Sequence, residues 1–317
     1  MRFLCVMDRL EKLDPEWDNS LAVLDELARR GHETWAADVP EIWAAGNSVL
    51  ASAHRIRRKG KIFTSSRPEI FRLDQFDKIL IRKEPPFNKA YLQLTDLLEP
   101  VAERVPILNH PAGIRNTNEK LSVLNFPKWI PKTLVSDSAE SILDFQKRLR
   151  GPVIVKPLDQ KGGRGIFLIT PHQRDARHRL IKATRNGKKT LMAQQFINAK
   201  KKVEKRIVIL NGKILALYEK RPRGKEFRAN LALGGTWHPA RASVPEKKLV
   251  RELRPYLLKQ GLYFVGIDVL NGKLLEINVT CPAGVTEARF LRQRPDPLAA
   301  WADFLEAFPP PSGRRAS

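Results

Sequence analysis

The sequence has few cysteines, no long apolar run and a shortage of acidic side chains. Its two cysteines, Cys5 and Cys281, lie far apart in the chain, which excludes a disulfide framework and favours a cytoplasmic protein. No apolar run approaches the ~18 residues of a membrane-spanning helix. The apolar opening is broken at Asp8, which favours a first strand over a signal peptide. We therefore expect no association with a membrane.

The shortage of acidic residues leaves a large positive charge. Lys and Arg number 57 and Asp and Glu number 34, so the net charge is +23. This charge favours anionic partners such as nucleotides, polyanionic substrates or nucleic acid. The basic clusters, for example residues 55–61 and 200–202, are not interleaved with base-stacking aromatic residues and match no DNA-reading motif. A non-catalytic nucleotide- or nucleic-acid-binding protein remains one alternative.

The first third of the chain has the pattern of a small α/β domain. Residues 3–7, 78–81 and 105–108 read as buried parallel strands, and Ser20 is a candidate N-cap for a helix that ends at Gly31. The pattern predicts a doubly wound parallel-sheet domain over residues 1–115. Asp8 and Arg82 lie at carboxyl ends of its strands, where such domains bind ligands.

The rest of the chain alternates short strands with helices. We predict domain limits at 116–195 and 196–308, followed by a disordered tail over 309–317. The expected elements are a strand at 152–157, a glycine-rich loop at 159–165, a returning strand at 166–169, a helix at 174–185, a strand at 191–197, hairpins around Asn211-Gly212 and Asn271-Gly272, and a helix near 298–308.

Three side chains on the last predicted hairpin suggest a metal site. Asp268, Glu276 and Asn278 carry hard oxygen ligands of the kind that Mg²⁺ prefers, within strands that are otherwise apolar. The alternative is a surface hairpin with a solvated polar face. A plain two-residue turn would place Asp268 opposite Leu275 and turn Glu276 to the other face. If both carboxylates bind one metal cluster, the hairpin must contain an extra residue or a bulge, and we predict that irregularity.

A lysine and a glycine-rich loop suggest a phosphate site. Lys156 ends a predicted buried strand, and the backbone N–H groups of Gly162, Gly163 and Gly165 can approach phosphate without a Cβ in the way. The loop is not a Walker A motif, because no Gly-Lys-Ser/Thr follows. A simple glycine turn of a hairpin is the alternative.

An arginine and a second glycine-containing segment complete the candidate site. Arg206 opens a strand just after Glu204, and it could neutralise a phosphoryl group in transfer. The alternative is a surface ion pair between these two residues. Arg228, Gly234 and Gly235 lie on a long basic loop that could act as a lid or could be a simple connector.

From residue 1 to about residue 287 the chain resembles the bacterial glutathione synthetases of the ATP-grasp superfamily. Several motifs carry the resemblance in order along the chain: VMD (6–8), RKEPPF (82–87), NEK (118–120), VKPLDQKGG (155–163), MAQQF (192–196), KR (205–206), RANLALGG (228–235) and VGIDVLNGKLLEINVT (265–280). The resemblance implies a two-lobed ATP-grasp fold after the first domain. It also implies an ATP-dependent carboxylate–amine ligase that works through an acyl phosphate.

The resemblance further implies the substrates and cofactors. They are γ-glutamylcysteine and glycine with ATP and Mg²⁺, as two ions for which Mn²⁺ can substitute, and a homo-oligomer, by analogy a tetramer. The implied residues are Lys120, Lys156, Gly162, Gly163, Gln194, Gln195, Phe196, Ile197 and Glu204 for ATP; Asp268, Glu276 and Asn278 for metal; Arg206 and Arg228 for catalysis; and Ser20, Arg82, Arg228, Gly234, Gly235 and Cys281 for substrate.

The chain departs from the family pattern on the substrate side. Cys281 and Ala283 replace two hydroxyl residues, and Lys220 stands where the family has an arginine of the lid. Replacing arginine with lysine removes the bidentate fork that grips a carboxylate. A related ATP-grasp ligase with a different peptide or an acidic acceptor is therefore a second alternative.

Overall fold

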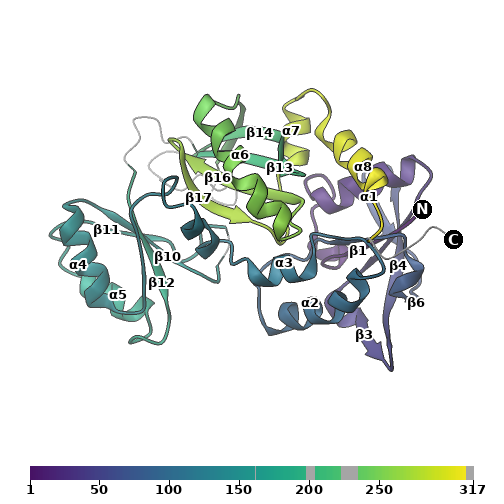
Figure 1. Ribbon diagram of the computed structural model, residues 1–317, viewed down its shortest axis with the longest axis horizontal. Coiled ribbons are helices and arrows are strands. Elements are labelled where there is room, and N and C mark those ends of the chain that lie inside the picture. Colours follow the sequence, from purple (N-terminus) through teal and green to yellow (C-terminus); the bar gives the residue numbers. More distant parts are fainter. Residues whose placement is uncertain (161, 198–203, 223–234, 312–317) are drawn as a thin grey trace.

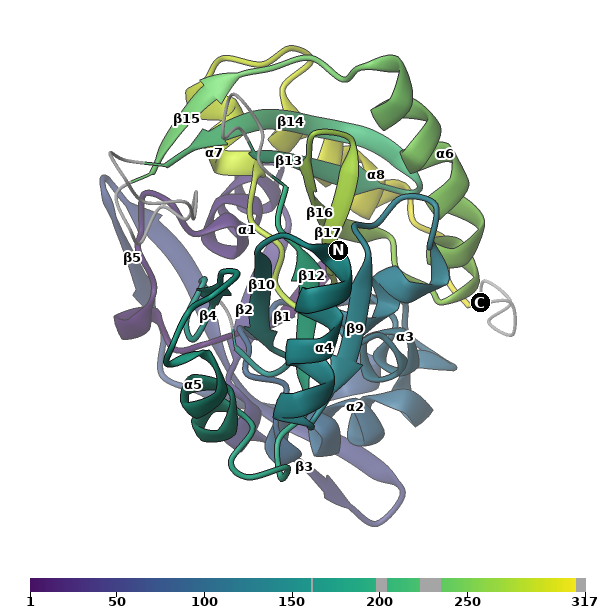
Figure 2. The same cartoon turned by 90° about the vertical axis from the view of Figure 1, so that its left-hand side faces the viewer.

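The computed structural model describes residues 1–160, 162–197, 204–222 and 235–311. Its strands form three sheets (Figure 1), and each sheet falls within one of the three segments expected from the sequence. Figure 2 views the molecule from the side of the central sheet and shows the third sheet above it. In the described ranges no helix is both long and apolar enough to span a bilayer.

The first sheet has a parallel centre and an antiparallel extension. Its strands are β1 (Arg2–Val6), β2 (Glu33–Ala37), β3 (Ile42–Ala45), β4 (Ser48–Lys59), β5 (Ile62–Ser65), β6 (Glu69–Arg72), β7 (Lys78–Ile81) and β8 (Ile107–Leu108), in the order β3-β4-β2-β1-β7-β8 with β5 and β6 on β4. The parallel strands predicted from sequence are confirmed as β1, β7 and β8. The antiparallel strands β3 to β6 were not predicted.

Helices cover both faces of this sheet, as a doubly wound domain requires. Along β1, Phe3 and Cys5 pack in the same cluster as α1 (Asn19–Arg29), whereas Leu4 and Val6 pack with α2 (Lys89–Ala102). The alternation follows from the period of two along a strand. The predicted doubly wound arrangement is therefore present.

The start of α1 differs from the prediction. Asp18, and not Ser20, is the N-cap, and its carboxylate accepts hydrogen bonds from the backbone N–H groups of Ser20 and Leu21. A carboxylate at this position satisfies two free N–H groups and interacts favourably with the helix dipole. The predicted end of the helix at Gly31 is confirmed, with φ +86°.

The central sheet is antiparallel and has one open face. It contains β9 (Thr133–Ser136), β10 (Val153–Pro157), β11 (Phe167–Ile169) and β12 (Leu191–Gln195), in the order β11-β10-β12-β9. Helices α4 (Ala139–Leu149) and α5 (Ala176–Ala183) pack on the side away from the third sheet (Figure 1). Ile154, Lys156 and Gln194 therefore point from the other face toward the third sheet.

The third sheet carries the two predicted hairpins. Its strands are β13 (Glu204–Leu210), β14 (Lys213–Arg221), β15 (Thr236–Pro239), β16 (Phe264–Leu270) and β17 (Lys273–Asn278), in the order β15-β14-β13-β16-β17, and α6 (Val244–Lys259) covers one face. Asn211-Gly212 and Asn271-Gly272 all have positive φ, between 49° and 73°, as a type I′ turn requires. Both hairpins are confirmed.

Three further helices pack on the elements described above. They are α3 (Pro111–Asn116), α7 (Val285–Phe290) and α8 (Pro297–Ala307). The last of these confirms the predicted helix near 298–308, and it packs on α1. Its Trp301 stacks on Phe264 with ring centroids 4.0 Å apart, and Lys78 of β7 donates to the backbone oxygen of Glu306 at 2.7 Å. Within the predicted tail, residues 312–317 lie outside the described residues.

Candidate active site

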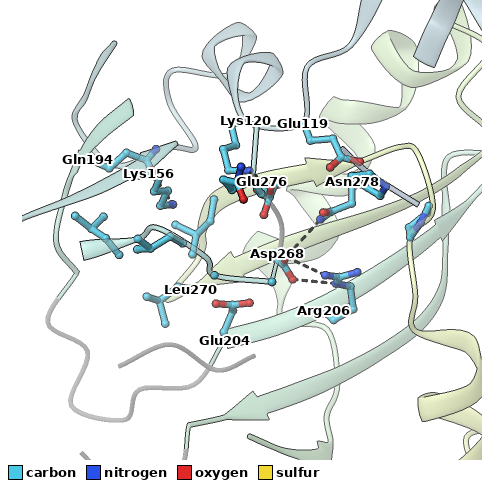
Figure 3. A pocket seen from close by; sticks show the side chains of 18 of the residues that line it. Glu119, Lys120, Lys156, Gln194, Glu204, Arg206, Asp268, Leu270, Glu276 and Asn278 are labelled. Atoms are coloured by element: carbon cyan, nitrogen blue, oxygen red, sulfur yellow. Dashed lines mark hydrogen bonds and ion pairs between the residues drawn. The ribbon is translucent and has the colours of Figure 1, made fainter. Parts of the chain in front are cut away.

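A cavity of about 310 Å³ lies between the central and third sheets. Figure 3 shows side chains from both sheets that point into it. The first segment contributes Glu84 and Pro85 to its wall. Most predicted site residues line this cavity: Lys120, Lys156, Gly162, Gly163, Gln194, Gln195, Phe196, Ile197, Glu204, Arg206, Asp268, Glu276, Asn278 and Cys281.

The predicted irregularity in the β16–β17 hairpin is confirmed. Asp268 pairs with Glu276, whereas Val269 pairs with Leu274, so Leu275 is the extra residue of a bulge. The bulge turns both carboxylates to the same face, and Asn278 lies beside them (Figure 3). Asp268 is only 6% exposed. The alternative of a solvated surface hairpin is therefore wrong.

Arg206 lies beside Asp268. Its Nε is 2.9 Å from Oδ1 and its Nη2 is 3.0 Å from Oδ2 of that carboxylate, and its Nη1 donates to the backbone oxygen of Ala283 at 3.1 Å. This bidentate geometry is the strong form of an ion pair. The alternative of a surface pair with Glu204 is wrong, because Glu204 pairs with Lys220.

Lys220 lies in β14 and not on a lid. It is buried, and its Nζ contacts the carboxylate of Glu204 and lies 2.8 Å from Oδ1 of Asp268. Burial alone would raise the pKa of Asp268, but Arg206 and Lys220 outweigh that effect and hold the pKa below its ordinary value. Burial would likewise lower the pKa of Lys220, but Asp268 and Glu204 outweigh it and keep the lysine charged.

Two lysines point into the cavity from the central segment (Figure 3). The Nζ of Lys156 donates to Oε1 of Gln194 at 2.7 Å, and burial lowers the pKa of this lysine. The Nζ of Lys120 donates to the backbone oxygen of Gln160 at 2.7 Å and lies 3.0 Å from Oε1 of Glu276. The second contact links the lysine directly to the paired carboxylates of the hairpin.

The glycine-rich loop needs its glycines for their backbone conformation. Gly162, Gly163 and Gly165 have φ of +64°, +75° and +69°, values that residues with a Cβ rarely adopt. The loop joins β10 to β11, which pair as an antiparallel hairpin. The loop is therefore the turn of a hairpin, and two of its glycines also line the cavity, so the phosphate site stays a prediction.

Some predicted substrate residues lie away from the cavity wall. Arg82 and Ser20 are buried behind the loop at residues 281–283, where Arg82 donates to Oγ of Ser20 at 3.2 Å and to the backbone oxygen of Pro282 at 3.0 Å. Gly235 precedes β15 and does not line the cavity. The predicted residues Arg228 and Gly234 lie outside the described residues.

Glu119 is a cavity residue that the sequence analysis did not identify. Its Oε1 accepts hydrogen bonds from the backbone N–H groups of Val279 and Thr280 and from the Thr280 hydroxyl, at 2.8 to 3.1 Å. Burial, reinforced by the nearby charge of Glu276, raises its pKa. Its position within the NEK motif was the available signal, but no pattern distinguishes a carboxylate that anchors a strand from one that faces solvent.

The predicted metal-ligand set contains two carboxylates and an amide. Across the parts of the chain that the structure describes, no group of three or more His, Cys, Asp or Glu side chains is arranged to hold a metal. Asp268, Glu276 and Asn278 offer oxygen ligands only, without nitrogen or sulfur. This donor chemistry suits Mg²⁺, which takes one or two carboxylates and completes its shell with phosphate and water.

Comparison with known families settles the class of this fold. The model of the prokaryotic glutathione synthetase N-terminal domain matches residues 1–115, and that of the prokaryotic glutathione synthetase ATP-grasp domain matches residues 119–293. The chain belongs to this family. The predicted family and the predicted fold class are both confirmed, and the protein is an ATP-dependent ligase that forms a carbon–nitrogen bond.

Individual relatives agree over nearly the full length. The glutathione synthetase of Parasynechococcus marenigrum is 37% identical over 297 residues, which cover 93% of this chain and 96% of that protein. The glutathione synthetase of Bradyrhizobium diazoefficiens is 33% identical over 282 residues, with 88% and 90% covered. These relatives support the glutathione synthetase type within the ATP-dependent ligases.

Solved structures show the same fold at low sequence identity. A RiPP-associated ATP-grasp ligase from Chryseobacterium gregarium superposes with a TM-score of 0.66 at 14% identity, covering 100% of both chains. A RimK domain ATP-grasp protein from Sphaerobacter thermophilus superposes with a TM-score of 0.62 at 17% identity, covering 97% of this chain and 100% of that one. These similarities support the ATP-grasp fold alone.

Proposed function

We propose that this protein joins the carboxylate of γ-glutamylcysteine to the amine of glycine, with ATP as the phosphoryl donor. The observation that carries the proposal is one cavity that holds Asp268 and Glu276 on the same strand pair and two lysines opposite them. A carboxylate does not acylate an amine in water because its oxygen is a poor leaving group. Phosphorylation by ATP removes that obstacle.

The cavity wall supports a nucleotide between the two sheets. Apolar side chains from both sides, Ile154 of β10 and Leu270 and Leu275 of the hairpin, leave a slot suited to a flat base. Gln194 to Ile197 contribute the edge of that slot, and Glu204 at its end is suited to ribose hydroxyls. Lys120, Lys156 and the backbone N–H groups of the glycine-rich loop would then face the phosphates.

Asp268, Glu276 and Asn278 would hold Mg²⁺, as two ions, with Mn²⁺ as a substitute. A divalent cation bound there offsets the charge of a triphosphate that meets a carboxylate. The guanidinium of Arg206, fixed by Asp268 and the Ala283 carbonyl, adds a cation where charge spreads over the transferring phosphoryl oxygens. Arg228 remains a proposed catalytic and substrate-binding residue on the basis of the resemblance.

The chemistry proceeds in two balanced steps. The carboxylate oxygen of the dipeptide attacks the γ-phosphorus and ADP leaves, which gives an acyl phosphate. The amine nitrogen of glycine then attacks the acyl carbon, loses a proton, and inorganic phosphate departs with the C–O electron pair. A cavity that excludes water protects the acyl phosphate from hydrolysis.

The loop that follows β17 forms the substrate side. Cys281 and Ala283 line the cavity, and Arg82 fixes the carbonyl between them. The resemblance implies that Arg82 and Ser20 contact the dipeptide directly. In this structure they lie behind the loop, so we propose that they act indirectly, by holding the loop in position. Because Cys281 and Ala283 replace hydroxyl residues of the family, a related peptide or acidic acceptor is the second candidate.

An ADP-release assay across pairs of acids and amines tests the proposal. We expect turnover with γ-glutamylcysteine and glycine that needs both substrates and a divalent cation. Turnover with another pair alone would favour the second candidate, and no ADP release with any pair would count against both. Light scattering of the purified protein tests the proposed homotetramer. The division at residues 115 and 195 and the cytoplasmic location remain proposals.

A further inference from the structure

The carboxylate of Asp268 is surrounded by hydrogen-bond donors. Its Oδ1 accepts from Nε of Arg206 at 2.9 Å and from Nζ of Lys220 at 2.8 Å. Its Oδ2 accepts from Nη2 of Arg206 at 3.0 Å and from Nδ2 of Asn278 at 3.4 Å. A carboxylate has about four acceptor positions in all. A metal ion therefore binds Asp268 only if one of these donors moves.

Of the two cationic donors, Lys220 is the one that can move more easily. Arg206 is held at three points, by both oxygens of Asp268 and by the Ala283 carbonyl, in the fixed geometry of a guanidinium fork. Lys220 carries a compact ammonium on a flexible stem and has a second carboxylate partner, Glu204. The ammonium can therefore leave Asp268 and remain paired with Glu204.

The charges of this buried group are balanced. Asp268, Glu204 and Glu276 contribute three negative charges, and their ion-pair partners Arg206, Lys220 and Lys120 contribute three positive charges, with side chains at most 25% exposed. A divalent cation added alone would place two uncompensated positive charges in a region of low dielectric, where such repulsion is strong. A cation that arrives with nucleotide phosphates brings its own negative charge and avoids that cost.

We propose that Lys220 is a positioning residue that occupies the metal-binding side of Asp268 and thereby makes divalent-metal binding depend on nucleotide. This inference rests on the proposed metal site. Lys220 excludes the metal alone, because the ammonium must be displaced without compensation. It admits the metal–nucleotide complex, because the phosphates compensate for the displaced charge.

Mn²⁺ binding tests the inference without measuring turnover. The full chain is titrated with Mn²⁺, and free Mn²⁺ is measured by electron paramagnetic resonance, with and without a non-hydrolysable ATP analogue. We expect Lys220→Met to bind Mn²⁺ alone at least about tenfold more tightly than the wild type. With the analogue present, the wild type should bind as well. Lys205→Met is the matched control, because Lys205 pairs with Glu246 and does not contact Asp268.

A double variant tests whether the gain in Mn²⁺ affinity comes from the freed oxygen of Asp268 or only from the loss of one positive charge. Lys220→Met with Glu204→Gln removes one positive and one negative charge, and it avoids leaving Glu204 buried without a partner. If the gain in Mn²⁺ affinity persists in the double variant, the inference holds. If the gain disappears there, or if the wild type binds Mn²⁺ alone as tightly as Lys220→Met, the inference is overturned. Absence of Mn²⁺ binding in every protein, even with the analogue, would instead overturn the proposed metal site.

Discussion

Replacing Glu276 with Gln should abolish turnover while leaving the fold intact. Glu276 lies opposite Asp268 across the bulged hairpin, and its side chain is 25% exposed. Gln has nearly the same size and still offers one oxygen, so packing and hydrogen bonding change little. The negative charge of a proposed metal ligand is lost. This variant therefore separates a chemical role from a structural one.

The expected magnitudes follow from the contacts of Glu276. Its ion pair with Lys120, at 3.0 Å, joins a carboxylate that is 25% exposed to a buried lysine, and Gln keeps an oxygen that this lysine can contact, so the change should cost about 1 kcal/mol of stability. In a protein of this size that corresponds to a fall in Tm of no more than about 4 °C. Even outer partners of metal ligands change affinity or activity by about 10- to 100-fold. Loss of a direct ligand should therefore lower kcat by about 100-fold or more, or at least about 2.7 kcal/mol.

The matched control is Glu252→Gln. Glu252 lies on α6, accepts a hydrogen bond from Nε1 of Trp129 at 2.6 Å and pairs with Lys128 at 3.8 Å, away from the cavity wall. Both variants are measured by ADP release and by thermal unfolding. The control should keep wild-type kcat. Retention of kcat within about threefold in Glu276→Gln would show that this carboxylate is no metal ligand.

Three further predictions concern other parts of the molecule. Lys156→Ala should raise the KM for ATP at least about tenfold and leave the KM of the amine unchanged, because it removes a cavity cation that we propose contacts the phosphates. An effect confined to the amine would refute its role. Burial lowers the pKa of His110, so the unfolded state holds this proton more tightly. The free energy of unfolding should then fall as pH drops below about 6.5, and less so in His110→Asn; equal urea-unfolding profiles would refute this. A Cβ on Gly113 would lie 1.9 Å from the backbone oxygen of Gln260, so Gly113→Ala should lower the free energy of unfolding by about 1–3 kcal/mol in a thermal melt. Gly151→Ala is the control and should change it little, because a Cβ there would lie 3.7 Å from the backbone oxygen of Leu149.

The sequence predicted the local geometry that depends on side-chain period and turn chemistry. Asn-Gly pairs readily adopt the positive φ that a two-residue hairpin turn requires, so both hairpins could be predicted from the sequence. The bulge near Asp268 was predictable because a period of two cannot otherwise place both carboxylates on one face. Such features depend on a few neighbouring residues, and tertiary context does not override them.

Partners from distant strands were not predictable in the same way. Lys220 lies 48 positions from Asp268, and only the antiparallel pairing of β14 with β13 and of β13 with β16 brings the two together. Glu119 anchors the end of β17 from a segment about 160 residues earlier. The antiparallel extension built on β4 was missed as well, because its strands are half-exposed and mix basic with apolar residues.

The position of α8 has a consequence for biosynthesis. Trp301 and Leu305 complete an apolar cluster that begins with Phe3 and Cys5, and Arg30 at the end of α1 is bound to Asp303 and Glu306. A ribosome makes β1 and α1 long before it makes α8. One side of the core around β1 and α1 therefore stays uncovered until α8 has emerged, and nascent chains that stall before residue 297 would present that apolar side to chaperones.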